Sequence, residues 1–294
     1  MMEKQMAFTL VNPQNGHLAF KIFDFEGASY FDHVQRNNYY SLIIIQEGVG
    51  TAKSDFSNYE FEEKTVFAFS PYQPFMFTPF DNLKGSAILF HPDFFCIHKH
   101  HNEVACNGVL FNNIYHPPFL RINESQEKHL LDLIGEMKLE VQDPGLAQYE
   151  LLISHLKILL IRLSRIKADQ SPQAKLNLAE TEQPFILQNL RDAIENNYRI
   201  KHAAGEYASL LNISPKALGK ITKAHFKKTV TNLVSERIII EAKRELYLTS
   251  KTIKEIAWEL GYEDEYHFSR FFKTNTEISP QIYRRTVGFA AAGG

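Results

Sequence analysis

Short runs of β-branched and aromatic residues alternate with turn residues between positions 18 and 90. The clearest runs occupy positions 40–46, 65–70 and 86–90, and stretches rich in Gly, Asp, Asn and Pro separate them. Short strands repeated at this spacing predict a small all-β barrel or sandwich.

Two amphipathic helices should follow, because from position 123 onwards the apolar residues recur with a period of 3.6. The stripe of the first helix contains Leu130, Leu133, Ile134 and Met137, and that of the second contains Leu152, Leu156, Leu159, Leu163 and Ile166. The second helix carries more apolar residues than one buried face needs, the additional ones being Leu151, Ile153, Ile158, Leu160 and Ile161. This excess indicates a second apolar contact, with either the barrel or another subunit. We favour a homodimer that forms through this helical hairpin.

An aromatic set in the β-rich region has two interpretations. One is the lining of a ligand cavity in the barrel, formed by Tyr39, Phe67, Phe69, Phe75, Phe77 and Phe80. The other is a packed aromatic core, the usual place of apolar residues at strand spacing.

Charge is distributed unevenly along the chain. The 294 residues include 32 Lys and Arg against 34 Asp and Glu, so the net charge does not by itself indicate a polyanionic partner. Residues 184–285, however, contain 17 basic and 12 acidic side chains, whereas the remainder contains 15 and 22. The two ends should therefore have different partners. Residues 168–183 mix Ser, Pro, Gln, Ala and charges without an apolar period, which predicts a linker.

Other features indicate the compartment. The chain has only Cys96 and Cys106, too few for a disulfide framework. Its first ten residues contain no apolar segment of signal-peptide length, and its most apolar helix is too short and too charged to cross a membrane. We therefore expect a cytoplasmic protein.

The last hundred residues contain an internal repeat. Residues 200–230 align with residues 250–280 at an offset of 49 before a central turn and 50 after it, and each copy has the pattern of a helix, a tight turn and a second helix. At the two turns stand Asn212 and Gly261, residue types that tolerate the left-handed conformation that ends a helix. Two helix-turn-helix units are therefore predicted, joined by a long helix over positions 230–248.

A lysine stripe marks the second helix of the first unit. Its apolar side is expected to contain Leu218 and Ile221, and the opposite side carries Lys216, Lys220, Lys223 and Lys227. Like charges on one face repel each other in water, and that cost disappears when DNA phosphates lie opposite. A solvated lysine face is the usual interpretation for a lone helix, but the duplicated architecture favours a DNA-binding surface.

The motifs of this region carry a family resemblance. They include Asn212-Ile213-Ser214-Pro215-Lys216-Ala217-Leu218, Ile253-Lys254-Glu255-Ile256-Ala257, Leu260-Gly261-Tyr262 and Phe268-Ser269-Arg270-Phe271-Phe272-Lys273. Over about residues 185–286 the chain closely resembles the DNA-binding domain of AraC/XylS-type bacterial transcription regulators. The resemblance implies an N-terminal cupin-like barrel that binds a small effector or mediates dimerisation.

The resemblance also implies which side chains meet the duplex. These are Ser214, Lys216, Gly219, Lys220 and Lys223 around the first recognition helix, and Glu265, Tyr266, His267, Arg270 and Lys273 in the second. Lys223 and Lys273 fit phosphate contacts. Lys and Arg can engage guanine N7 and O6, and Glu265 can accept from cytosine N4. For the acidic cluster at positions 263–265, capping of a helix N-terminus is the alternative.

Helix ends depart from the family pattern in both units. Lys227 and Glu277 stand where a glycine often follows each recognition helix, so these ends should be closed in another way. Ala203 and Ala204 stand where Ser or Thr commonly caps the opening helix of the first unit, a loss of about 1 kcal/mol. The second unit retains a capping box at Thr252 and Glu255.

A cluster of zinc-type ligands invites a metal interpretation. It comprises Cys96, His98, His100, His101 and Cys106. Its spacing matches no recognised ligand pair, so we assign no metal and no cofactor. A metal-dependent cupin-type enzyme is the weaker alternative, because positions 18–90 contain only His33 as an imidazole ligand.

The sequence therefore predicts an α+β fold. It should consist of a cupin-like barrel over 1–122, a helical hairpin over 123–167, a linker over 168–183 and an all-α domain with two helix-turn-helix units over 184–287. The predicted function is sequence-specific DNA binding by a transcriptional regulator, not catalysis, under the control of a small effector in the barrel. An effector-independent regulator whose barrel only dimerises is the alternative. The expected partners are double-stranded DNA, a small-molecule effector and a second copy of the chain, with RNA polymerase as a further candidate and no membrane.

Overall fold

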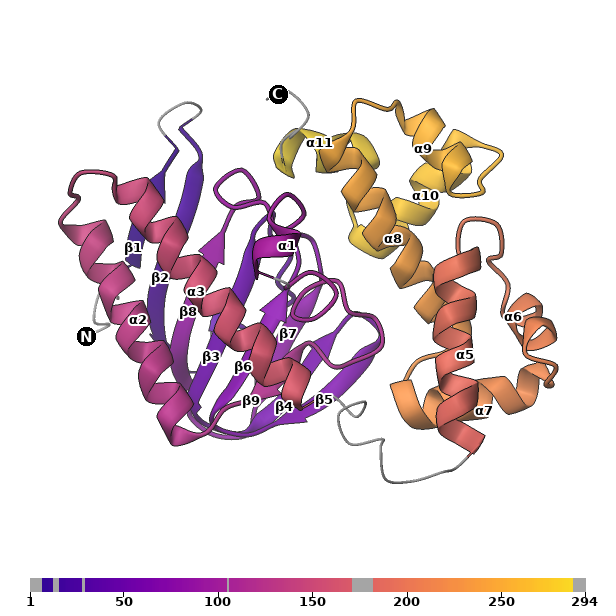
Figure 1. Ribbon diagram of the computed structural model, residues 1–294, viewed down its shortest axis with the longest axis horizontal. Coiled ribbons are helices and arrows are strands. Elements are labelled where there is room, and N and C mark those ends of the chain that lie inside the picture. The colour runs from indigo at the N-terminus through magenta and orange to yellow at the C-terminus, as the bar shows by residue number, and fades with distance from the viewer. Residues whose placement is uncertain (1–6, 13–15, 28–29, 105, 171–181, 288–294) are drawn as a thin grey trace. The chain divides into compact units, whose positions relative to one another are not determined.

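The computed structural model describes residues 7–12, 16–27, 30–104, 106–170 and 182–287, and it divides into two compact units (Figure 1). The N-terminal unit comprises Met1–Asn113 and Pro117–Ala174, and the C-terminal unit comprises Ile114–His116 and Lys175–Gly294. Both ends of the predicted linker are helical, because one helix runs to Asp169 and the next starts at Glu182. Its residues 171–181 lie outside the described residues.

Two antiparallel sheets form the N-terminal unit. The larger has the strand order β1-β2-β8-β3-β6-β9 and the smaller has the order β5-β4-β7. The strands are β1 (Ala7–Val11), β2 (Leu18–Glu26), β3 (Tyr40–Glu47), β4 (Gly50–Ser54), β5 (Ser57–Phe61), β6 (Thr65–Phe69), β7 (Phe75–Pro79), β8 (Lys84–Phe90) and β9 (Phe119–Arg121). The sheets and the helices that follow confirm the predicted α+β class.

Strand β3 shows why this unit has two hydrophobic cores. Its first six residues are all buried, because the strand is covered on both faces and successive side chains point to opposite faces. Ile43 and Ile45 belong to an aromatic core shared by the two sheets. Leu42 and Ile44 belong to a second core, which the helical hairpin closes.

The hairpin consists of α2 (Glu124–Gln142) and α3 (Gln148–Asp169), which cover the outer face of the larger sheet after the short helix α1 (His101–Val104) (Figure 1). The predicted stripe of α2 is buried in full. In α3 the predicted leucines are buried and Ile166 is half-buried. Of the additional apolar residues, Leu160 joins the core, whereas Leu151 and Ile158 remain 41% and 43% exposed.

The C-terminal unit is helical throughout its described residues. Its helices are α5 (Glu182–Asn197), α6 (Ala204–Leu210), α7 (Pro215–Phe226), α8 (Val230–Leu248), α9 (Ile253–Glu259), α10 (Glu265–Thr276) and α11 (Pro280–Val287). Helix α8 is the predicted connecting helix, and it lies between the two helix-turn-helix units in the sequence.

A buried carboxylate holds α8 in place. Glu241, only 4% exposed, accepts hydrogen bonds from Arg199 Nη2 (2.7 Å), Arg237 Nη1 (3.2 Å) and Arg244 Nη1 (2.9 Å). Burial by itself would raise the pKa of Glu241, but the surrounding guanidinium groups, with Arg237 the strongest, lower it below its ordinary value. Glu241 is therefore ionised near neutral pH and links α8 to the end of α5.

The short segment Ile114–His116 belongs to the same unit. Tyr115 Oη donates to Glu195 (3.0 Å), and the guanidinium carbon of Arg191 lies 5.2 Å from the centre of the Tyr115 ring. Burial and the adjacent Glu195 raise the pKa of Tyr115, so its hydroxyl remains a donor. Lys228 Nζ donates to the Ile114 carbonyl (3.2 Å).

Candidate functional site

Both helix-turn-helix units have the predicted geometry, and the same hydrogen bond closes each turn. In the first unit the Ile213 N–H donates to the Ala208 carbonyl (3.1 Å), and in the second the Tyr262 N–H donates to the Ala257 carbonyl (2.9 Å). The two bonds are related by the offset of 49 found in the sequence. The internal repeat of the sequence is therefore a repeat of structure.

The predicted left-handed residues stand at both turns. Asn212 has φ +53° and Gly261 has φ +80°. At Gly261 the conformation is accompanied by a close approach, because a Cβ atom there would lie 2.2 Å from the carbonyl oxygen of Arg199. The second turn therefore requires glycine for two separate reasons.

Each recognition helix begins with a side-chain cap. Ser214 Oγ accepts from the Ala217 N–H (3.2 Å) at the start of α7. At the start of α10 the carboxylate of Asp264 accepts from the N–H groups of Tyr266 (3.0 Å) and His267 (3.2 Å). The capping interpretation of the acidic cluster is thus confirmed for Asp264, and Ser214 has a structural role in addition to the predicted DNA contact.

The buried faces of the recognition helices match residue for residue at an offset of 50. Helix α7 buries Leu218, Thr222 and Phe226, and α10 buries Phe268, Phe272 and Thr276. Ile221, expected on the apolar side, is only half-buried, because the buried row follows the i, i+4, i+8 spacing that selects Thr222. Thr222 satisfies its hydroxyl by donating to the Gly219 carbonyl (3.2 Å).

The opposite faces carry most of the predicted DNA contacts, and we call these exposed side chains the reading face. It consists of Lys216, Lys220 and Lys223 on α7 and of Tyr266, His267, Arg270 and Lys273 on α10. Gly219 and Glu265 are half-buried at its edge.

The basic groups of the reading face differ from the other basic groups of this unit. Across the described residues, none of its lysines or arginines forms an ion pair, and neither does Lys227 just beyond α7. By contrast, Arg199, Arg237 and Lys251 of the same unit are all paired with carboxylates at 2.7 Å. Uncompensated positive charge is thus concentrated where the recognition helices are exposed.

The ends of the recognition helices correct one expectation. Lys227 has φ +58° and Glu277 has φ +63°, so both helices end in the same left-handed conformation that a glycine would adopt. The expectation of a different closure was wrong. The chain instead places two residues with side chains in a backbone conformation that costs such residues about 1 kcal/mol or more.

The opening helix of the first unit lacks half of its cap. Ala203 has the extended backbone of an N-cap residue but no side chain to accept a hydrogen bond. The carboxylate of Glu206 still accepts from the N–H groups of Ala203 (2.9 Å) and His202 (3.1 Å). In the second unit the exchange is complete, because Thr252 Oγ1 also accepts from the Glu255 N–H (3.2 Å).

Replacing Ala203 by threonine should stabilise the start of α6 by about 1 kcal/mol. Oγ1 would accept from the Glu206 N–H, which in the original chain donates only to the Ala203 carbonyl (3.1 Å). Amide hydrogen exchange of peptides from α6 should slow by about fivefold. Ala204→Thr, one position inside the helix, is the control and should give no protection. Equal exchange in the Ala203→Thr variant and the original chain would contradict the proposed cap.

Comparison with known proteins agrees with this geometry. Residues 207–286 match the family model of a helix-turn-helix domain. The chain is 22% identical over 262 residues to the HTH-type transcriptional activator RhaS of Enterobacter sp. (strain 638), with 88% of each chain aligned. It is 23% identical over 264 residues to RhaS of Salmonella schwarzengrund (strain CVM19633), again over 88% of each chain. The chain is a DNA-binding transcriptional regulator that is similar to those of the AraC/XylS type.

Solved structures similar to this regulator are of two kinds. The C-terminal domain of the response regulator yesN from Fusobacterium nucleatum is 26% identical and covers 33% of this chain and 95% of its own, with a TM-score of 0.32. The unsaturated fatty acid-bound ToxT from Vibrio cholerae strain SCE256 is 15% identical and covers 94% of this chain and 98% of its own, with a TM-score of 0.39.

The structure gives contacts for some of the zinc-type ligands of this regulator, and the side chain of His101 lies outside the described residues. Cys96 and Cys106 are free and buried, and burial raises the pKa of Cys106 to about 12. The ring of His100 stacks on Phe95, and its Nδ1 bonds to Glu103 (2.8 Å). In the part of the chain that the structure describes, three or more His, Cys, Asp or Glu side chains do not gather in metal-binding geometry. Within the same residues, none of the helices has the length and hydropathy to cross a bilayer.

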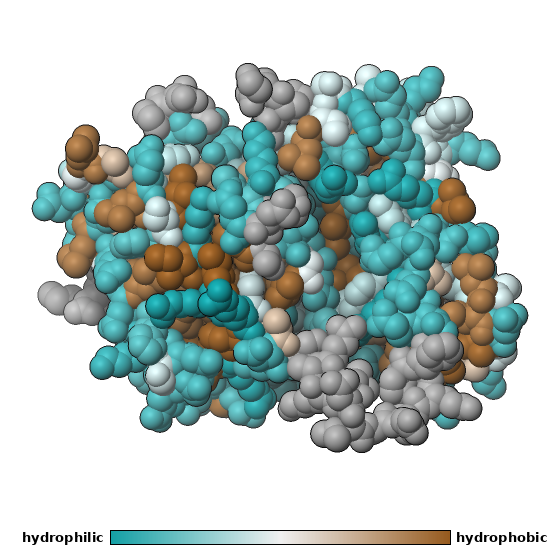
Figure 2. All heavy atoms as spheres, in the orientation of Figure 1, coloured by the Kyte–Doolittle hydropathy of each residue, from teal (hydrophilic) through white to brown (hydrophobic). Residues whose placement is uncertain are grey.

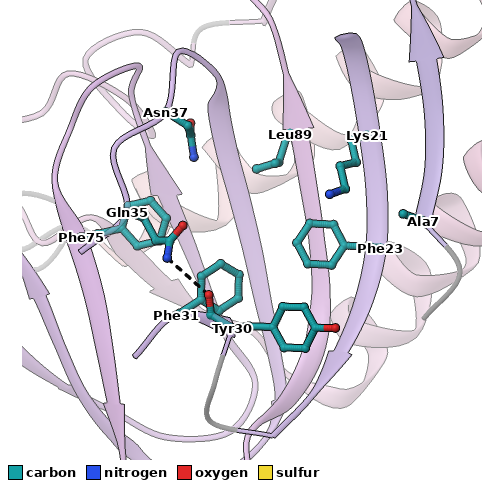
Figure 3. Close-up of a pocket in the computed structure, with 9 residues that line it drawn as sticks. All are labelled: Ala7, Lys21, Phe23, Tyr30, Phe31, Gln35, Asn37, Phe75 and Leu89. Atoms are coloured by element: carbon teal, nitrogen blue, oxygen red, sulfur yellow. Dashed lines mark hydrogen bonds between the residues drawn. The ribbon is translucent and has the colours of Figure 1, made fainter. Parts of the chain in front are cut away.

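The N-terminal unit of this regulator contains a pocket of about 310 Å³, shown in Figure 3. Its walls include the rings of Phe23, Tyr30, Phe31 and Phe75. The loop that closes it is fixed to β7 by two backbone hydrogen bonds between Gln35 and Phe75, 2.7 and 3.2 Å long. The volume is at the lower end of the range for small-molecule sites.

The predicted pocket residues lie mostly deeper than this lining. Phe75 is the member of the predicted set that lines the pocket, whereas Phe67, Phe69 and Phe77 are fully buried in the aromatic core. The packed-core alternative therefore describes these three residues. Tyr39 is not one of the lining residues, and its ring lies 5.6 Å from the ring of His91. Phe80, also expected in the barrel, is 70% exposed.

Sequence reasoning missed the charged residue of the pocket, Lys21. The signal was present in the alternation along β2, where Lys21 shares a face with Phe23 and Phe25. Inward positions of a strand are usually apolar, so a lysine at such a position is a signal of a binding site.

Proposed function

We propose that α7 and α10 enter two successive major grooves of a single duplex. The observation that supports this is the unpaired positive charge of the reading face, which lies on two helices that each begin with a side-chain cap and bury equivalent positions. Helix α8 has 19 residues, which at 1.5 Å per residue spans about 28 Å. Successive major grooves on one face of DNA lie about 34 Å apart.

Roles within the reading face follow from chemistry. Lys216, Lys220 and Arg270 are donors suited to guanine O6 and N7. Lys223 and Lys273, one turn further along each helix, suit phosphate oxygens. The remaining contacts of the proposed interface are Ser214, Gly219, Glu265, Tyr266 and His267.

Replacing Lys220 or Arg270 by alanine should weaken binding to the specific site by about 1–3 kcal/mol, or about 5- to 150-fold, with relaxed base preference at the positions contacted. The site is first recovered by selection of genomic fragments on the full chain, and affinities are then measured by fluorescence anisotropy at fixed salt concentration. Lys128→Ala, which removes an equally exposed charge from α2, is the control and should bind as the original chain does. Unchanged affinity in both reading-face variants would exclude these residues from the interface.

A salt titration separates base contacts from phosphate contacts. Lys223→Ala should reduce the slope of log affinity against log salt by about 1 without changing base preference. A slope equal to that of the original chain would remove Lys223 from the phosphate contacts.

The N-terminal unit is proposed to sense a small effector and to change DNA binding when the effector occupies the pocket near Phe75. The alternative is an effector-independent regulator whose N-terminal unit only dimerises. A metabolite that changes operator affinity of the full chain supports effector control, and a Leu89→Trp variant that fills the pocket should lose the response. Contact with RNA polymerase stays a prediction.

The hairpin is proposed to form a homodimer. Leu151 and Ile158 lie seven residues apart on α3 and are 41% and 43% exposed, and Figure 2 shows hydrophobic side chains gathered over this helix. A stripe of this kind is typical of helix–helix interfaces. Sedimentation equilibrium should show a dimer that Ile158→Glu converts to a monomer. Arg162→Glu is the control for a charge change on the same helix. An unaltered dimer in the Ile158→Glu variant would place the interface elsewhere.

A further inference from the structure

The pocket of the N-terminal unit combines an apolar body with a single charge. Its lining includes four aromatic rings and Leu89, and its polar side-chain groups are those of Lys21, Gln35 and Asn37 and the hydroxyl of Tyr30. The lining contains no Asp and no Glu. Pockets of this composition select a ligand that is mostly apolar and carries a few polar groups at defined places.

Lys21 is directed at the ligand space. Figure 3 shows its ammonium group pointing toward the middle of the ring of lining residues, and Nζ lies 4.7 Å from the centre of the Phe23 ring. The residue is half-buried. Over the described residues, no carboxylate lies within ion-pair distance of Nζ.

Neighbouring lysines of the same unit do have such partners. Lys84 pairs with Glu47 at 2.9 Å, and Lys138 pairs with Asp24 at 2.6 Å. The pocket therefore holds a half-buried cation that faces aromatic walls without an anion. A ligand that brings a carboxylate would form the charge-assisted hydrogen bond that Lys21 lacks.

The side-chain amides of Gln35 and Asn37 supply the remaining hydrogen-bonding groups considered for the ligand. The Gln35 side chain is oriented by its own loop, since Nε2 bonds to the carbonyl oxygens of Tyr30 (3.3 Å) and His33 (3.2 Å) and to Nε2 of His33 (3.0 Å). This leaves the Gln35 side-chain oxygen as an acceptor for a ligand. The Asn37 side-chain oxygen accepts from the Tyr39 N–H (3.1 Å), which leaves its NH₂ group as a donor. A neutral polyhydroxylated ligand would place many hydroxyl groups against rings, with only four side chains, Tyr30 among them, to pair them.

We propose that this pocket takes a small aromatic carboxylate, with the ring between Phe23, Phe31 and Phe75 and the carboxylate on Lys21 Nζ. Ring-to-ring contacts favour an aromatic body over an aliphatic one of the same size. The ammonium of Lys21 favours a carboxylate over a neutral amide of the same shape. This inference rests on the proposed effector role of the pocket and specifies the ligand class.

The test compares matched acids and amides on the full chain. Benzoate, phenylacetate and cinnamate are each titrated by calorimetry beside benzamide, phenylacetamide and cinnamamide, with saturation-transfer NMR for weak binders. The carboxylates should bind at least about tenfold more tightly than their amides. Lys21→Met should remove the preference for acids over amides, and Lys21→Arg should keep it. Lys53→Met, an exposed charge in β4 of the same unit, should behave as the original chain does.

Equal affinity for acids and amides, an undiminished preference in Lys21→Met, or no binding of any carboxylate at millimolar concentration would overturn the proposal. Operator affinity, measured in the same series, distinguishes failure of the proposed ligand class from failure of effector control. If carboxylates bind through Lys21 without changing operator affinity, the ligand class stands and effector control by this class fails. If a neutral metabolite changes operator affinity while the acids do not bind, effector control stands and the ligand class is wrong.

Discussion

Replacing Glu241 by alanine should destabilise the C-terminal unit by about 3–5 kcal/mol, because the change leaves Arg199, Arg237 and Arg244 facing one another without their shared carboxylate. We expect a value at the lower end of this range, since Arg199 and Arg244 are 42% and 46% exposed and water can solvate them. Amide exchange of α5 and α8 in the full chain should accelerate by more than a hundredfold, and operator affinity should fall with it.

The same cluster predicts a dependence on pH. The pKa of Glu241 is lower in the folded state than in the unfolded chain, so its contribution is fully present at neutral pH and is lost as the pH falls through the folded pKa. The Glu241→Ala variant should therefore lose stability less steeply than the original chain below about pH 4. The control is Glu259→Gln, which breaks a partly exposed pair with Lys251 and should cost at most about 1 kcal/mol. A Glu241→Ala chain as stable as the control would show that the three arginines need no common anion.

Gly261→Ala should destabilise the second helix-turn-helix unit by about 2–5 kcal/mol. Part of this is the cost of φ +80° for a residue with a side chain, and part is the displacement of backbone, because the added Cβ would lie 2.2 Å from the Arg199 carbonyl oxygen. The turn should open or shift, and α10 would no longer be held in its present orientation. Specific DNA binding should be lost even at temperatures where the chain remains folded.

Asn212→Gly is the matched variant at the equivalent turn. Asn212 already adopts φ +53°, so glycine there should change stability by no more than a few tenths of a kcal/mol. Thermal unfolding and operator binding are measured for both variants. The comparison separates the effect of the positive φ that both turns require from the effect of the close approach to Arg199 in the second unit. Similar behaviour of Gly261→Ala and Asn212→Gly would exclude a special role for the Arg199 contact.

The C-terminal unit was predicted from local features of the sequence. The turn residues Asn212 and Gly261, the capping box at Thr252 and the exposed lysines of α7 are each determined by residues within a few positions of one another. Such features can be found from sequence because a helix and its caps are local structures. The assignment of Ile221 rather than Thr222 to the buried row failed because a polar residue occupies a core position and satisfies its hydroxyl within the helix.

The N-terminal pocket could not be found in the same way. Its lining combines β1, β2, β7 and β8 with the loop around Tyr30 and Gln35, and no local pattern brings these segments together. The aromatic residues were chosen by type, and the deepest of them, Phe67 and Phe69, fill the space between the sheets. The role of Glu241 was missed for a related reason. Its partners Arg237 and Arg244 are local, but the third, Arg199, lies 42 positions away.

Under the proposed docking of α7 and α10 on one duplex, helix α8 limits how the binding sites of this regulator can diverge. A continuous helix of 19 residues, held by a buried carboxylate, allows little adjustment in distance or angle between the two halves of a recognised sequence. Inserting one base pair between the halves would rotate one against the other by about 34–36°, which two helices joined in this way cannot follow. Genomic sites should therefore differ by base substitution and not by gap length, and an ungapped sequence motif should suffice to find them.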